Sequence, residues 1–106
     1  MENTKILKKI EENPVIAAIR NEEDLEDAIE SPVSTIFLLH ADIFNLYPTV
    51  NKVKRSGKNV FIHFDMLEGI GRDNRAIDYI YQQVIPHGII STKNSHIKYA
   101  MGKGMF

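Results

Sequence analysis

Residues 60–71 read VFIHFDMLEGIG. Three apolar residues come first, His63 and Asp65 follow two positions apart, and an acidic turn with two glycines closes the stretch. A short apolar run of this kind is typical of a buried strand, and its polar end marks the point where the chain reaches solvent. That end can belong to a functional site or to ordinary barrel scaffold.

Three further short apolar runs have the same character: Val15–Ile19, Ile36–Leu39 and Ile89–Ile90. Runs that are apolar on both faces predict parallel strands covered by helices. Apolar residues at helical spacing lie between and after the runs and predict helices there: Leu25, Ala28 and Ile29; Leu46, Val50 and Val53; Ala76, Ile77, Ile80, Tyr81 and Val84; Ile97, Ala100 and Met101. A short leading helix is predicted near residues 4–12.

The predicted strands begin near residues 14, 35, 58 and 87. Alternation of strand and helix favours parallel pairing through right-handed crossovers, and therefore an α/β fold. A complete TIM-type barrel needs at least about 200 residues, whereas this chain has 106. We therefore predict one (β/α)-barrel-like domain over residues 1–106, with four parallel βα repeats that make about half of a truncated barrel. The alternatives are a complete small sheet and a half-barrel that self-associates with its own copy, because parallel edge strands would be exposed.

The charge balance argues against a dedicated nucleic-acid binder, because thirteen Lys and Arg face fourteen Asp and Glu. Any RNA contact must use a local patch. The absence of cysteine excludes disulfides and thiolate chemistry. No secretory signal and no apolar run of about 18 residues is present, so the expected location is cytoplasmic.

A polar group follows each predicted strand. In parallel α/β folds ligands bind at the carboxyl ends of strands, so we expect these groups to share one rim. Together they predict a site for a small anionic ligand with no cofactor and no metal, formed by Arg20, His40, His63, Asp65, Ser91, Thr92 and Lys93.

Each part of this rim also has a structural interpretation. Arg20 could pair with one of the acids at residues 22–24, His63 and Asp65 could seal the barrel mouth, and Asn94 or Ser95 could cap a helix. A metal set of His63, Asp65 and Glu68 with His40 or Asp42 is a further alternative, which would suit catalysis.

Other polar residues favour structural roles. His87 and His96 are expected to be structural or solvated, and the group Lys52, Lys54, Arg55 and Lys58 is expected to be a solvated helix end more readily than an RNA contact. The glycines at 69 and 71 predict a tight turn, because the rest of a dinucleotide-binding motif is missing.

Four stretches together resemble one family: NPVIAAIR, IFLLHADI, GKNVFIHFDMLEGI and PHGIISTKNSHIKYA. From about Pro14 to Phe106 the chain is similar to the start of the glycerol-3-phosphate-responsive antiterminators. The resemblance implies a (β/α)-barrel-like protein without catalysis, which binds leader mRNA in response to glycerol 3-phosphate as its effector. It implies that Arg20, His63, Asp65 and the run Ser91–Lys93 lie on the ligand face.

Two other functions stay open from the residues alone. One is an enzyme, either a metal-assisted glycerophosphodiester hydrolase or another phosphosugar-handling barrel enzyme, with His63 as acid or base. The other is a fragment whose missing half carries the important groups.

Overall fold

The computed structural model describes residues 16–105, and the predicted leading helix lies outside them. A parallel four-stranded sheet has the order β1-β2-β4-β6, and its strands are Ile16–Ile19, Thr35–Leu38, Asn59–His63 and Gly88–Ile90. The helices that follow them are α2 (Glu22–Glu30), α3 (Leu46–Arg55), α4 (Asn74–Tyr79) with the π-helix η2 (Ile80–Val84), and α5 (Asn94–Gly102). The prediction of parallel (β/α) repeats with four strands is confirmed, and the fold is a partial barrel.

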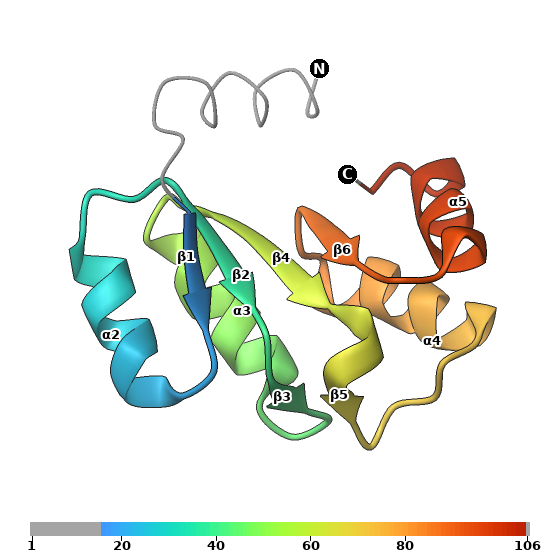
Figure 1. Ribbon diagram of the computed structural model, residues 1–106, viewed down its shortest axis with the longest axis horizontal. Coiled ribbons are helices and arrows are strands. Elements are labelled where there is room, and N and C mark those ends of the chain that lie inside the picture. Colours follow the sequence, from blue (N-terminus) through green and yellow to red (C-terminus); the bar gives the residue numbers. More distant parts are fainter. Residues whose placement is uncertain (1–15, 106) are drawn as a thin grey trace.

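Helices α2, α3 and α4 cover one face of the sheet, as Figure 1 shows. The starts of α3 and α4 depend on nearby residues. The Asp73 side chain accepts a hydrogen bond from the Ala76 amide at 3.0 Å and caps α4. Helix α3 begins directly after Asn45, so Pro48 lies in its first turn, where its missing amide hydrogen costs no helical bond. Of the helices in residues 16–105, none is both long and apolar enough to cross a membrane.

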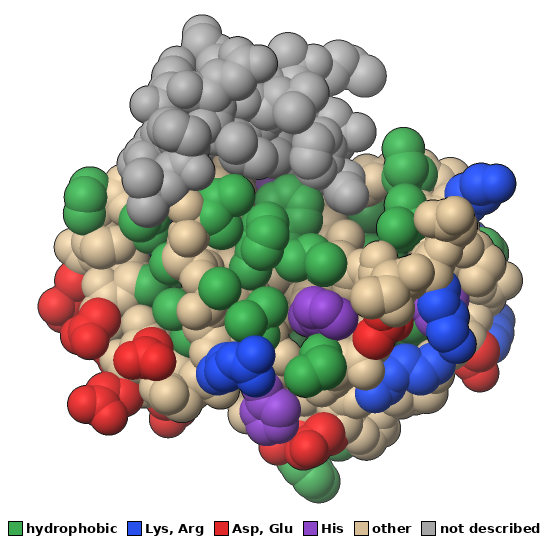
Figure 2. All heavy atoms as spheres, in the orientation of Figure 1, with side chains coloured by type: hydrophobic (Ala, Val, Ile, Leu, Met, Phe, Trp, Pro, Cys, Tyr) green, Lys and Arg blue, Asp and Glu red, His purple; other side chains and the backbone are tan. Residues whose placement is uncertain are grey.

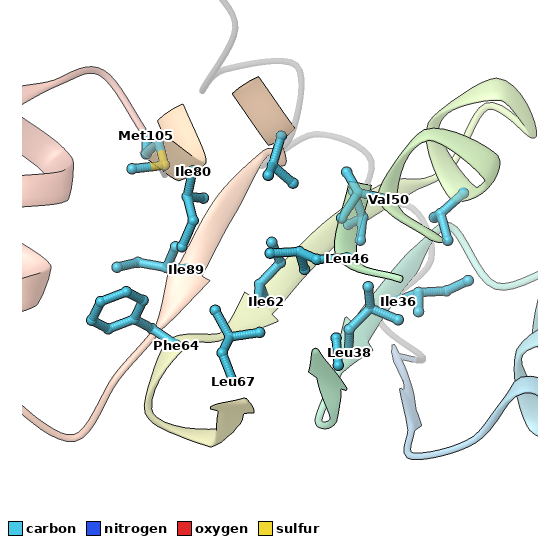
Figure 3. Packing of buried hydrophobic residues seen from close by; sticks show 14 of the residues in the cluster. Ile36, Leu38, Leu46, Val50, Ile62, Phe64, Leu67, Ile80, Ile89 and Met105 are labelled. Atoms are coloured by element: carbon cyan, nitrogen blue, oxygen red, sulfur yellow. The ribbon is translucent and has the colours of Figure 1, made fainter. Parts of the chain in front are cut away.

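The core lies between the sheet and these helices (Figure 3). Ile36, Val60 and Ile62 from the strands are fully buried there, together with Val50 and Ile80 from the helices. Strand residues alternate between the two faces, so the register partners Phe37 and Phe61 lie on the opposite face. Their ring centroids are 5.5 Å apart.

The face opposite the helices is apolar in its middle. Figure 2 shows hydrophobic side chains across it, with histidine and basic side chains below them. His63 follows Phe61 by two residues and therefore shares this face. Both edge strands of the sheet, β1 and β6, have one neighbour each within the described chain.

A second, two-stranded parallel sheet was not predicted. It pairs β3 (Ala41–Asp42) with β5 (Leu67–Glu68). In the chain, β5 directly follows the 3₁₀ helix η1 (Phe64–Met66). Two-residue strands carry too little periodicity to be recognised. They fix the loops that follow β2 and β4, and hence the rim of the sheet.

The turn after β5 depends on Gly69, which has a φ of +81°. A Cβ there would lie 2.9 Å from the Cγ2 atom of Ile43. We expect Gly69→Ala to lower the free energy of unfolding by about 2 kcal/mol, through backbone strain and the clash together. Gly57 has a similar φ of +84° with nothing within 4 Å, so Gly57→Ala is the control and should cost about 1 kcal/mol. Equal losses in urea unfolding would show that the contact with Ile43 is unimportant.

The π-helix ends at Ile85, which has a φ of +56°. A β-branched residue in this left-handed region is strained. We expect Ile85→Gly to raise the free energy of unfolding by about 1 kcal/mol, whereas Ile85→Val, which keeps the branched carbon, should give no gain. Thermal unfolding measures both, and a loss of stability for the glycine variant would contradict the expectation.

Candidate ligand site at the carboxyl ends of the strands

The predicted polar groups do share one rim. Arg20 follows β1, His40 lies two residues beyond β2, His63 ends β4 and Ser91 follows β6. All four strands are parallel neighbours, so their carboxyl ends meet at one edge of the sheet. Within that rim the side chains form two separate groups, one at β1 and β2 and the other at β4 and β6.

Asp65 is the centre of the group at β4 and β6. Its carboxylate accepts hydrogen bonds from the Thr92 amide at 2.8 Å and the Thr92 hydroxyl at 3.0 Å. The Ser91 hydroxyl donates to the same carboxylate at 3.0 Å. These bonds join the loop after β4 to the loop after β6. The contacts of Asp65 are therefore those expected from its structural interpretation, in which it seals the barrel mouth.

His96 completes this group, although the sequence suggested only a structural or solvated histidine. It is buried, and its Nδ1 atom lies 3.2 Å from the Ser91 hydroxyl and 3.6 Å from an Asp65 carboxylate oxygen. Its Nε2 atom lies 3.0 Å from the Arg72 carbonyl oxygen, which can only accept, so we assign a proton to Nε2. The only available signal was its place in the first turn of a helix, from which side chains point back toward the N-terminus.

The pKa of Asp65 is below its ordinary value. Burial acts to raise this pKa, but the hydrogen bonds from Thr92 and Ser91 outweigh it, and the charge of His63 lowers it further. The carboxylate is therefore ionised at neutral pH and its oxygens are occupied. This environment suits a structural anchor better than a proton-transferring group.

The start of α5 differs from the structural interpretation in which Asn94 or Ser95 caps the helix. Lys93 itself occupies the position before the helix, and neither Asn94 nor Ser95 caps it, because α5 already begins at Asn94. The Lys93 amide donates to the Ser91 hydroxyl oxygen at 3.1 Å. Lys93 is exposed and follows Thr92, the residue that binds Asp65, so its side chain is accessible to an anion.

Arg20 and His40 belong to the other group. They line a pocket of about 170 Å³ together with Ile19, Asn21, Glu22, Leu25, Leu38, Asn45 and Thr49. The alternative in which Arg20 pairs with an acid at residues 22–24 is wrong, because no carboxylate in residues 16–105 forms an ion pair with it. The Arg20 guanidinium, the His40 imidazole and the Asn45 amide provide donors for a phosphate or carboxylate, whereas the Asn21 amide donates to Asp24. The Glu22 carboxylate lines the same pocket.

His63 lies between the two groups. Its Nδ1 atom is buried and has no hydrogen-bond partner among the described residues. A buried ring nitrogen without a partner is costly, and a ligand or water can supply one. Among residues 16–105, His63 is thus the rim histidine whose hydrogen bonding is incomplete.

The metal set considered as an alternative is not assembled among the described residues. His40 contacts Glu68, with 3.4 Å between Nε2 and Oε1, whereas Asp65 lies with Ser91, Thr92 and His96. Across residues 16–105 no three histidine, aspartate or glutamate side chains converge as metal ligands would. The β3–β5 pairing separates Glu68 from Asp65, and sequence spacing alone did not reveal this.

The basic group at the end of α3 is also more engaged than predicted. Lys58 donates to the carbonyl oxygens of Ser31 and Val33 at 2.7 and 2.6 Å. Lys54 donates to the Ile85 carbonyl at 2.8 Å, and Lys52 pairs with Glu26 of α2. Lys52 and Lys54 remain exposed, as expected for a solvated helix end, whereas Lys58 is half-buried. The contacts of all three lysines join α3 and the segment after it to their neighbours.

Fold and site together define a parallel (β/α)-repeat protein of the barrel type, with cationic and imidazole groups at the carboxyl ends of its strands. The family model of the glycerol-3-phosphate responsive antiterminators matches residues 15–106. The chain belongs to this family.

Similar proteins extend the comparison. The Escherichia coli (strain K12) protein described as uncharacterized protein YgcP is 38% identical over 101 residues, which are 95% of this chain and 53% of that protein. The crystal structure of the glycerol uptake operon antiterminator regulatory protein from Listeria monocytogenes str. 4b F2365 is 31% identical, with a TM-score of 0.82 over 85% of this chain and 49% of the other. A glycerol uptake operon antiterminator-related protein from Thermotoga maritima MSB8 is 28% identical, with a TM-score of 0.76 and coverages of 86% and 51%. The chain thus spans about half the length of these relatives.

Proposed function

We propose that this protein is a transcription antitermination regulator of glycerol metabolism, which binds leader mRNA in the cytoplasm when glycerol 3-phosphate occupies the strand-end site. The observation that carries the proposal is the family match over residues 15–106. The protein would act by binding and not by catalysis, since Asp65, the acid nearest His63 in the chain, is held as an ionised structural anchor. Glycerol 3-phosphate is its effector, and no cofactor takes part.

Arg20 and His40 are the proposed phosphate contacts. Arg20 offers a planar pair of donors, and no carboxylate of the described residues forms an ion pair with it. His63 and Lys93 lie farther along the same rim and would bind the remaining polar groups of the ligand. In this proposal Asp65, Ser91 and Thr92 act on the ligand through the shape of the rim, because their side chains are bonded to one another.

Thermal unfolding with glycerol 3-phosphate tests this site, with inorganic phosphate as the control ligand. A ligand that binds the native state at about 100 times its Kd stabilises it by about 2.7 kcal/mol. Arg20→Gln and His40→Ala should abolish the shift, and Lys98→Gln on exposed α5 should retain it. No shift for the unaltered chain, or an equal shift with phosphate, would reject the site.

Leader-RNA binding is tested separately, by fluorescence anisotropy of a labelled leader transcript of a glycerol uptake operon. Glycerol 3-phosphate should tighten binding, and binding should weaken steeply with salt because phosphates are neutralised. Absence of binding with and without glycerol 3-phosphate would reject the regulatory function. Binding that ignores glycerol 3-phosphate would reject its role as effector.

We also propose that the half-barrel self-associates. Within residues 16–105 the edge strands β1 and β6 each pair on one side only, and the visible middle of the sheet face opposite the helices is apolar. A copy related by a two-fold axis would place its β1 beside β6 and continue the parallel order. Light scattering coupled to gel filtration should give twice the monomer mass, and a monomer at all concentrations would reject the proposal.

A further inference from the structure

A groove runs between α3 and the helical segment formed by α4 and η2, in the outer layer of the fold. Tyr47 from α3, Tyr79 from α4 and Gln83 from η2 line it, and its volume is about 460 Å³. The two tyrosines are 51% and 39% exposed. A smaller hollow of about 280 Å³ shares Tyr79 and continues along α4 past Arg75. The groove is thus open and aromatic, and it is distinct from the strand-end rim.

Positive charge gathers on both sides of this groove. Helix α3 contains no acidic residue, and of its basic residues Lys52 pairs with Glu26 and Lys54 donates to the Ile85 carbonyl oxygen. Arg55 has no ion pair with a described residue and lies about two turns after Tyr47 on α3. Arg75 lies four residues before Tyr79 and so shares its side of α4.

No acidic residue of residues 16–105 lines the groove itself, and Asp73 lines the adjoining hollow. Six of the fourteen acids lie on α2, visible at the left of Figure 2. The acid of α4, Asp78, accepts a hydrogen bond from the Tyr99 hydroxyl at 2.7 Å and lies 3.6 Å from the Lys103 ammonium, and its other carboxylate oxygen lies 4.0 Å from an Arg75 nitrogen. The Arg75 side chain is 91% exposed, so this ion pair is weak and the guanidinium remains accessible to a phosphate.

We propose that unpaired bases of RNA bind in this groove, stacked on Tyr47 and Tyr79, with Arg55 and Arg75 at the phosphates. Single-stranded RNA is typically bound by exposed aromatic faces combined with exposed cations. The Gln83 amide can donate to and accept from base edges. A protein partner fits less well, because the lining is amphipathic and flanked by like charges. The inference rests on the proposed function and locates its RNA contact.

The test is the affinity of the chain for the same labelled leader transcript in the presence of glycerol 3-phosphate. We expect the double variant Tyr47→Ala/Tyr79→Ala to bind at least about tenfold more weakly, and Tyr47→Phe/Tyr79→Phe to retain most of the affinity, because phenylalanine still stacks. Tyr81→Ala is the matched control, since Tyr81 is 41% exposed but lies outside the groove lining. Circular dichroism shows whether each variant is folded, and the phenylalanine variant tests stacking where the alanines perturb the fold.

Salt dependence supplies a second measurement. Removing a phosphate contact with single-stranded RNA lowers the slope of log affinity against log salt by about 0.7. Arg55→Gln and Arg75→Gln should each do so, and Lys98→Gln on α5 should not.

The outcomes separate the inference from the proposed function. Leader binding that is unchanged in the tyrosine double variant would overturn the inference and leave the function standing. An unchanged RNA affinity with loss of self-association would identify the groove as a protein interface and also overturn it. Absence of leader binding by the unaltered chain would overturn both.

Discussion

Replacing Phe64 by alanine is expected to lower the free energy of unfolding by about 3–5 kcal/mol. Phe64 follows β4 directly, is fully buried, and belongs to the single core cluster of residues 16–105. Its ring meets the His96 ring edge to face, with centroids 4.9 Å apart. The truncation therefore removes buried apolar area and leaves a cavity beneath the Asp65 group.

Phe44→Ala is the matched control. The Phe44 side chain is 89% exposed, so its removal should change the unfolding free energy by less than about 0.5 kcal/mol. The Phe44 amide, which donates to the Asp42 carboxylate at 2.8 Å, is unaffected. Chemical denaturation of both variants measures the difference, and similar losses would mean that Phe64 does not pack in the core as described.

Replacing Asp65 by alanine is expected to cost about 2–4 kcal/mol. Hydrogen bonds to a charged group contribute about 1.5–3 kcal/mol each and are not additive within one cluster. The variant loses the bonds from Thr92 and Ser91 and leaves His96 without a nearby carboxylate. Asp27→Ala, on the exposed side of α2, serves as the control and should change stability little.

The stabilisation by Asp65 is expected to depend on pH. Its pKa is lowered in the folded chain from an ordinary value of 3.8, so its contribution is complete above that value and is lost as pH falls through the folded pKa. The stability difference between the unaltered chain and Asp65→Asn should be constant down to about pH 4 and shrink below it. A difference that instead grows in acid would contradict an ionised Asp65 in the network.

Much of the fold was predictable because its signals are local. Apolar runs such as Val60–Ile62 are short and uninterrupted, as strands covered on both faces must be, and their spacing predicted parallel crossovers. The start of α4 has a local cause as well, because the Asp73 side chain caps a helix that begins one residue later. Tyr81 was assigned to an apolar helical stripe but is exposed, because the π-helix changes the angular step after Ile80.

The site was predictable as a rim but not as a set of contacts. Strand ends identified the residues that would share an edge, and the sheet order places Arg20, His40, His63 and Ser91 there. The division into an Asp65 network and an Arg20 pocket could not be inferred, because it depends on loop paths set by β3 and β5. His96 was missed as a partner of Asp65 for the same reason.

The sequence by itself determined the order of strands and helices, the parallel class of the sheet, the family and the edge at which polar groups gather. Each of these follows from patterns a few residues long or from their spacing along the chain. Only the tertiary structure decided which polar groups are already bonded to one another and which remain available to a ligand. Hydrogen bonds such as those from Ser91 and Thr92 to Asp65 join residues 26 and 27 positions apart, and such bonds require distances and angles that only the packed loops provide.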